Sequence, residues 1–151
     1  MASKFLESLR EQKAKAQAGG ESVKATLAEW LTALDGLKTR ILEFLDEPIR
    51  EGLLEVETGQ QDVREERLGV YPTWTLEIFD PLGKRVVVAP TGRQVIGARG
   101  RVDFRVSPHR VMLIRAEDGS WSWVAEGSRQ RKLKDFTRDS LEEVLGELFQ
   151  L

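Results

Sequence analysis

Residues 72–92 read PTWTLEIFDPLGKRVVVAPTG, and this stretch decides the fold class. Its first part alternates Trp74, Leu76 and Ile78 with Thr75, Glu77 and Phe79, a period of two that is typical of a strand with one buried face. Asp80-Pro81-Leu82-Gly83 places Asp first, Pro second and Gly fourth, as a type I turn requires. We therefore predict a β-hairpin in which residues 84–90 return antiparallel to residues 73–79.

Further strands are predicted on both sides of this hairpin. Downstream, RQVIGA (93–98) and RVDFRV (101–106) are separated by Arg99-Gly100, SPH (107–109) turns the chain, and RVMLIRA (110–116) and SWSWVAE (120–126) flank a second hairpin turn at residues 117–119. Upstream, Val56, Val63 and Val70 suggest extended pieces, with a turn at residues 59–62. A continued helix is the alternative for residues 53–70.

A long amphipathic helix is predicted before the strands. Its large apolar residues recur at steps of three and four, which is typical of a helix with one buried face: Val23, Leu27, Trp30, Leu31, Leu34, Leu37, Ile41, Phe44 and Leu45. Pro48 marks its end or a kink. The apolar stripe indicates core packing, and a coiled-coil seam between two copies is the alternative.

The two ends of the chain also read as helices. Residues 1–20 begin with Ser3 as a possible cap, carry Phe5, Leu6 and Leu9 on one side, and end at Gly19-Gly20, which we expect to break the helix. Residues 136–151 read FTRDSLEEVLGELFQL, with Thr137 or Asp139 as the cap. The apolar face of this last helix is formed by Leu141, Val144, Leu145, Leu148 and Phe149.

These elements predict an α+β fold, because helices come first, then strands linked by short turns, then a helix. Short turns favour antiparallel neighbours, since parallel pairing needs long crossovers. The expected architecture is an N-terminal helical hairpin or arm, a central antiparallel meander of about five or six strands, and a C-terminal helix. We divide the chain into an arm at residues 1–20 and one α+β domain at residues 21–151.

Composition narrows the function classes. Of the 151 residues, 40% are hydrophobic and 32% are charged, and the formal net charge is −2, which argues against a wholly basic nucleic-acid binder. There is no cysteine, so thiolate chemistry and cysteine-ligated metals are excluded. The sequence shows neither a signal peptide nor a membrane span, and we expect a cytoplasmic protein without a membrane partner.

The glycines in VIGARGRVDF (95–104) raise the question of a phosphate site. A phosphate-binding loop needs a helix after its glycines, whereas Gly97 and Gly100 lead into an alternating strand. We therefore expect turn or bulge conformations at these glycines and no cofactor.

Arginines gather in the strand region and form the one candidate site. The candidate anion or partner face comprises Arg93, Arg99, Arg101, Arg105, Arg110, Arg131 and Lys132. If these side chains converge, an acidic protein would still present a basic face to an anionic partner such as nucleic acid. The alternative is an ordinary solvated surface of mixed charge. Asp103, between Arg101 and Arg105 on one strand, is interpreted as their ion-pair partner.

No catalytic or metal site is predicted. His109 is the only histidine, so the usual multi-histidine metal site is impossible, and Asp80, Asp103 and Glu126 form no recognisable acid–base pair. We expect a non-enzymatic binding or scaffold protein that acts through protein–protein contacts, with a homodimer formed through the N-terminal helices. The alternatives are a nucleic-acid-associated protein that uses the arginines and, less favoured, an enzyme that works through carboxylates.

Overall fold

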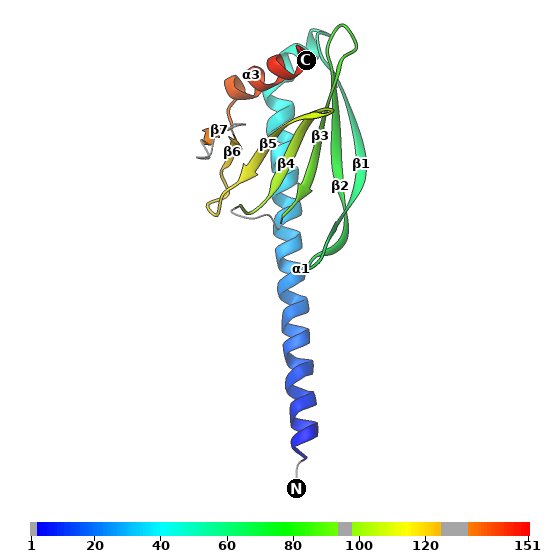
Figure 1. Cartoon of the computed structure of the whole chain (residues 1–151), viewed down its shortest axis with the longest axis vertical. Coiled ribbons are helices and arrows are strands. Elements are labelled where there is room, and N and C mark those ends of the chain that lie inside the picture. The colour runs from blue at the N-terminus through cyan, green and yellow to red at the C-terminus, as the bar shows by residue number, and fades with distance from the viewer. Residues whose placement is uncertain (1–2, 94–97, 125–132) are drawn as a thin grey trace.

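The computed structural model describes residues 3–93, 98–124 and 133–151, with the backbone alone for residues 16–21. Two helices precede seven strands and a third helix follows them, which confirms the α+β class (Figure 1). The elements in chain order are α1 (Lys4–Phe44), α2 (Asp46–Arg50), β1 (Glu55–Glu65), β2 (Gly69–Phe79), β3 (Arg85–Gly92), β4 (Arg101–Val106), β5 (His109–Arg115), β6 (Trp121–Val124), β7 (Leu133–Asp135) and α3 (Arg138–Phe149).

The strands form one meander in which each pairs antiparallel with its neighbours in sequence, in the order β1 to β7. Seven strands exceed the five or six expected, and β7 is the strand that the sequence analysis did not anticipate. It has three residues, all of them exposed, so it carries no buried face that a period-two pattern could reveal. The predicted strand at residues 93–98 lies mostly outside the described residues.

The turn at Asp80 is confirmed and joins β2 to β3. Gly83 N donates to Asp80 O at 3.0 Å, and the φ of Gly83 is +81°. The Asp80 carboxylate also accepts hydrogen bonds from the backbone N–H groups of Leu82 and Lys84, at 3.0 and 2.8 Å. Asp and Gly therefore fix this turn through their own local chemistry.

The turn expected at residues 59–62 is wrong, because β1 continues through these residues to Glu65. A Cβ on Gly59 would lie 2.7 Å from Thr75 Oγ1, so this glycine permits close approach of the paired strand rather than a reversal. Gln61 Nε2 donates to Thr73 Oγ1 at 3.1 Å and to Pro90 O at 2.8 Å. The polar residues 60–62 therefore lie within β1, where Gln61 bonds to β2 and β3, and the chain reverses after Glu65.

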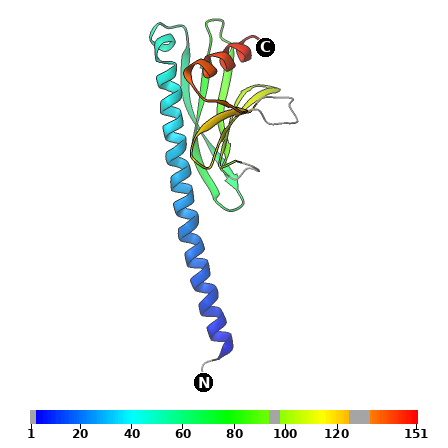
Figure 2. The same cartoon turned by 90° about the vertical axis from the view of Figure 1, so that its left-hand side faces the viewer.

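The predicted break at Gly19-Gly20 is also wrong, since α1 is a single helix of 41 residues. Each interior glycine costs a helix only about 1 kcal/mol relative to alanine, and helix growth from an anchored segment avoids a second nucleation. A helical hairpin is thereby excluded, and the N-terminal part of α1 projects beyond the sheet as an arm (Figure 2). We call residues 4–22 of α1 the stalk.

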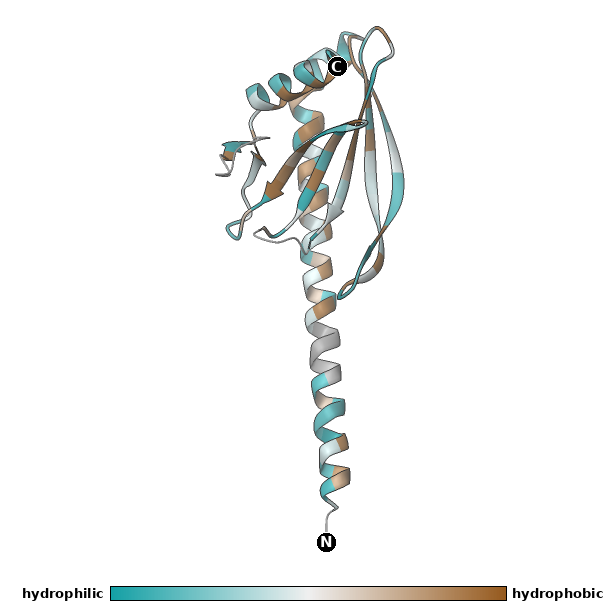
Figure 3. Ribbon diagram, in the orientation of Figure 1, coloured by the Kyte–Doolittle hydropathy of each residue, from teal (hydrophilic) through white to brown (hydrophobic). Residues whose placement is uncertain are grey.

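Helices α1 and α3 pack on the same face of the sheet. Trp30, Leu34, Leu37, Ile41 and Leu45 are at most 1% exposed. In Figure 3 most of the hydrophobic (brown) segments of α1 lie where the helix runs beside the sheet, and a few recur near the N-terminus. At the other helix, Thr137 is the cap and forms a capping box with Ser140. Ser140 Oγ also accepts a hydrogen bond from Trp123 Nε1 at 2.9 Å, which ties α3 to β6.

Trp30 is the contact point between α1 and the middle of the sheet. Its Nε1 donates to the hydroxyl of Tyr71 at 3.1 Å, and its ring centroid lies 6.1 Å from that of Trp121. A Cβ on Gly100 would lie 2.2 Å from Cζ3 of the same indole, and the φ of Gly100 is +157°. The positive φ expected at Gly97 or Gly100 is confirmed at Gly100, whereas Gly97 lies outside the described residues. Gly100 thus makes room for an aromatic ring of the core.

Trp30→Ala should lower the free energy of unfolding by about 3–5 kcal/mol, because it removes a fully buried indole and leaves a cavity. Chemical denaturation followed by far-ultraviolet circular dichroism measures this loss. Leu82→Ala, at a side chain that is 93% exposed, is the control and should leave stability unchanged. An unaltered denaturation midpoint for Trp30→Ala would contradict the assigned role of Trp30.

Gly100→Ala should destabilise the fold by about 1–3 kcal/mol, because the new methyl group collides with the Trp30 ring. Gly36→Ala is the matched control, since nothing lies within 4 Å of a Cβ added at Gly36. This helical glycine should instead gain about 0.5–1 kcal/mol on substitution. If both variants changed the melting temperature in the same direction, the result would contradict the contact between Gly100 and the Trp30 indole.

Candidate functional site

Two of the predicted arginines face each other on the sheet. Arg105 of β4 is directly opposite Arg110 of β5, and Val87 of β3 is opposite Arg105 on its other side. Arg85 is two residues from Val87 and therefore shares this face. Buried Val86, Val88 and Phe104 belong to the opposite face, so the three arginines point away from α1. We call Arg85, Arg105 and Arg110 the arginine row.

Two residues of the arginine row, Arg85 and Arg105, border a cavity, and Arg85 is the member of the row that has an ion-pair partner among the described residues. The cavity has a volume of about 420 Å³ and is lined by Arg85, Val87, Arg105, Val106 and Ser107. Arg85 Nη1 lies 3.7 Å from Glu77 Oε2, whereas neither Arg105 nor Arg110 forms an ion pair among the described residues. Like charges directly opposite one another destabilise a sheet. The arrangement is therefore suited to an anion that would bind between the guanidinium groups.

Arg101 is occupied by an internal ion pair. Its Nε and Nη2 donate to the two carboxylate oxygens of Asp103 at 2.7 and 2.8 Å, and the Asp103 side chain is only 8% exposed. The hydrogen bond to Asp103 raises the pKa of Arg101. The interpretation of Asp103 as an ion-pair partner is confirmed for Arg101 but not for Arg105.

A second group of arginines surrounds Glu29 on α1. Arg115 Nη2 lies 2.6 Å from Glu29 Oε1, and Arg99 Nη2 lies 3.0 Å from Glu117 Oε1. The hydrogen bond from Arg115 lowers the pKa of Glu29, and the charges of Arg115, Arg93 and Arg99 lower it further. Arg115 of β5 therefore binds α1 to the sheet, whereas Arg99 pairs with Glu117 in the turn after β5.

The predicted face therefore divides. Arg105 and Arg110 come together, and Arg99 and Arg101 form ion pairs within the fold. The backbone N–H of Arg93 donates to Glu65, whereas Arg131 and Lys132 lie outside the described residues. Arg85 was missed, although the alternation in KRVVVAP places it on the face opposite to Val86 and Val88.

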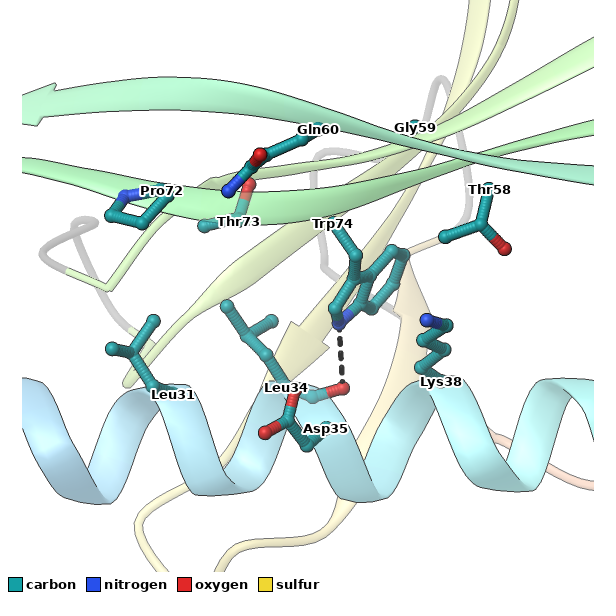
Figure 4. A pocket seen from close by; sticks show the side chains of 10 residues that line it. All are labelled: Leu31, Leu34, Asp35, Lys38, Thr58, Gly59, Gln60, Pro72, Thr73 and Trp74. Carbon is teal, nitrogen blue, oxygen red and sulfur yellow. Dashed lines mark hydrogen bonds between the residues drawn. The ribbon is translucent and has the colours of Figure 1, made fainter.

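A cleft separates α1 from the β1–β2 hairpin (Figure 4). Its volume is about 600 Å³, and it is lined by Leu31, Leu34, Asp35, Lys38, Thr58, Gly59, Gln60, Pro72, Thr73 and Trp74. The Trp74 indole N–H already donates to Leu34 O at 3.0 Å, which fixes the ring between helix and strand. The cleft offers one acid and one amine, but no pair of acids and no histidine among its lining residues. Asp35 and Lys38 are its two charged lining residues, and both come from α1.

The tip of the stalk exposes large apolar side chains. Phe5 is 70% exposed, Leu6 49% and Leu9 44%. Phe5 and Val23 are 18 residues apart, as are Leu9 and Leu27, and 18 residues make five helical turns. Val23 and Leu27 pack against the core. The side of α1 that binds the sheet thus continues to the tip, where no part of the described chain covers it.

The other residues considered for catalysis or metal binding are His109, Asp80 and Glu126. His109 is exposed at the start of β5 opposite Val106, Asp80 holds its turn, and Glu126 lies outside the described residues. Among the described residues, no group of three or more histidines and carboxylates could hold a metal ion. None of the described helices combines the length and apolar character needed to span a membrane.

The fold and these surfaces define an α+β meander protein with a projecting helical stalk. No family model, no curated protein and no solved structure matches the chain.

Proposed function

We propose that this protein is a non-enzymatic binding or scaffold protein whose stalk makes protein–protein contacts, in the first place with a second copy of the chain. The observation that carries the proposal is the exposed apolar tip on a helix that continues far beyond the sheet. Residues 4–22 span roughly 28 Å at 1.5 Å per residue, and an isolated helix of this length is marginal in water. A partner that covers Phe5 and Leu9 would stabilise it.

A second copy is favoured as the partner for two reasons. The tip cannot fold back on its own helix, because α1 is continuous through Gly19 and Gly20. Symmetric dimers are also the most common assemblies of soluble proteins. The tip is short, so the contact would be reversible, as suits a scaffold that assembles with concentration.

Sedimentation velocity over a concentration series tests this proposal. The full chain should shift from monomer toward dimer as the concentration rises, and deletion of residues 1–19 should abolish the shift. The double substitution Phe5→Ser and Leu9→Ser should do the same, because it removes the apolar tip and keeps the helix length. Leu82→Ser, which removes an exposed leucine elsewhere, should behave as the unmodified protein. A full chain that is monomeric at high micromolar concentration would refute the proposal.

The arginine row supports a second candidate function, the binding of an anionic partner such as nucleic acid. Guanidinium groups match phosphate geometry, and phosphate contacts supply most of the non-specific affinity for nucleic acids. The supporting observation is that Arg105 and Arg110 lie opposite one another and that neither forms an ion pair among the described residues.

The variant Arg110→Glu tests whether the arginine row binds an anionic partner or is an ordinary solvated surface. The substitution should raise the free energy of unfolding by about 0.2–1 kcal/mol at low salt, because it replaces a repulsive cross-strand pair with an attractive one. It should also weaken the salt-sensitive retention of the protein on immobilised DNA or RNA. Arg67→Glu, at an exposed arginine in the turn between β1 and β2, is the control for the change in net charge. If the unmodified protein shows no salt-sensitive retention on either nucleic acid, this second candidate is excluded.

A further inference from the structure

An apolar groove lies at the end of the molecule opposite to the tip, between α2 and α3. Its volume is about 370 Å³, and its apolar lining is formed by Leu45, Pro48, Leu53, Leu54, Leu145 and Phe149. Leu53 is 50% exposed beside it. A surface of this kind is typical of the grooves that receive the apolar side of a helix.

The rim of the groove is acidic. Glu47, Glu51 and Glu142 line it, and among the described residues no lysine, arginine or histidine does. Arg50 and Arg138 lie outside this lining, in a smaller hollow next to Glu47 and Glu142. An occupant with an apolar side flanked by basic residues would match both the lining and the rim.

The tip of α1 has these properties. Leu6, Leu9, Arg10 and Lys13 follow the helical spacing i, i+3, i+4, i+7 and therefore share one side of the helix. Glu7 and Glu11 fall on the other side. All residues from Ser3 to Lys15 are exposed, so the apolar and basic side chains are both available to a partner.

The tip of a chain cannot reach the groove of the same chain. The groove includes Leu45, which directly follows α1, so the length of α1 separates the two surfaces, roughly 60 Å for 41 residues. Figures 1 and 2 show the N-terminus and the α2–α3 region at opposite ends of the long axis. The contact can form only between different copies.

We infer that the tip of α1, residues 4–13, docks in the α2–α3 groove of a second copy of this chain. The inference rests on the proposed self-association and assigns the surface that receives the stalk. If two α1 helices run antiparallel, each tip comes beside the other copy's groove, because both separations equal the length of α1. The two contacts are then formed together, and the assembly closes as a dimer.

Gly146 provides a way to obstruct the groove without harming the fold. It lies on α3 in the groove lining, and nothing lies within 4 Å of a Cβ added there. Gly146→Lys should place a long cationic side chain in the groove and raise the intrinsic helix propensity. Gly36→Lys is the matched control, because it makes the same change of charge at another open helical glycine, outside the groove. We expect at least a tenfold loss of dimer affinity for Gly146→Lys, less than a twofold change for Gly36→Lys, and no loss of thermal stability for either.

Disulfide cross-linking tests the contact directly, because the native chain has no cysteine. A Leu9→Cys variant mixed with a Leu53→Cys variant should give a mixed disulfide dimer under mild oxidation, identified by a different mass tag on each variant. The same Leu9→Cys variant mixed with Leu82→Cys, on the exposed β2–β3 turn, should give at least tenfold less.

The outcomes separate this inference from the proposed function. A dimer that forms through the stalk, yet is unaffected by Gly146→Lys and gives no excess of the Leu9–Leu53 cross-link, would keep the proposed function and overturn the groove assignment. A chain that never dimerises would overturn both. Selective loss of the dimer with Gly146→Lys, together with the cross-link, would establish the groove as the receiving surface.

Discussion

The contact of the Trp30 indole with the sheet is the constraint on which the rest of the structure depends. The ring meets a glycine before β4, donates to a tyrosine of β2 and packs beside a tryptophan of β6, so one side chain fixes α1 against strands from most of the width of the sheet. The depth of this contact explains why Gly100 has no side chain. It also sets the line of α1 across the sheet, and with it the direction in which the stalk leaves the domain.

The features that could be predicted from the sequence are those decided by neighbours along the chain. The Asp80–Gly83 turn is set by one carboxylate and one glycine within four residues, and the helical stripe around Trp30 by spacing alone. The helix break predicted at Gly19-Gly20 and the turn predicted at Gly59–Asp62 are wrong, because glycine and polar residues only weakly favour the end of a helix or strand. At Gly59–Asp62 the pairing of β1 with β2 decides the conformation, and at Gly19-Gly20 the helix continues from the part of α1 that is anchored on the sheet.

Side-chain alternation can assign a residue to a face of its strand, but only strand register shows which residues of neighbouring strands meet. The sequence therefore predicts that arginines are abundant in the strands, yet it cannot show that Arg105 faces Arg110 while Arg101 turns to Asp103 and Arg99 to Glu117. The arginine row and the apolar tip share one property, which is that the stability of the fold does not account for them. Repulsive pairs and uncovered apolar surface are features that folding alone disfavours, and the two functions proposed above rest on them.

The order of the elements along the chain has a consequence for synthesis. Because every strand pairs with its neighbour in sequence, the sheet can grow hairpin by hairpin as the polypeptide emerges. Helix α1 is made before the sheet, and Gly100 and Trp121, which contact its Trp30, follow Trp30 by 70 and 91 residues. At about 5–20 residues per second, the apolar side of α1 waits roughly 4–18 seconds for these partners. During that interval the apolar residues from Val23 to Phe44 lack the strands that cover them in the folded domain, so the order of synthesis sets how long this part of α1 stays exposed.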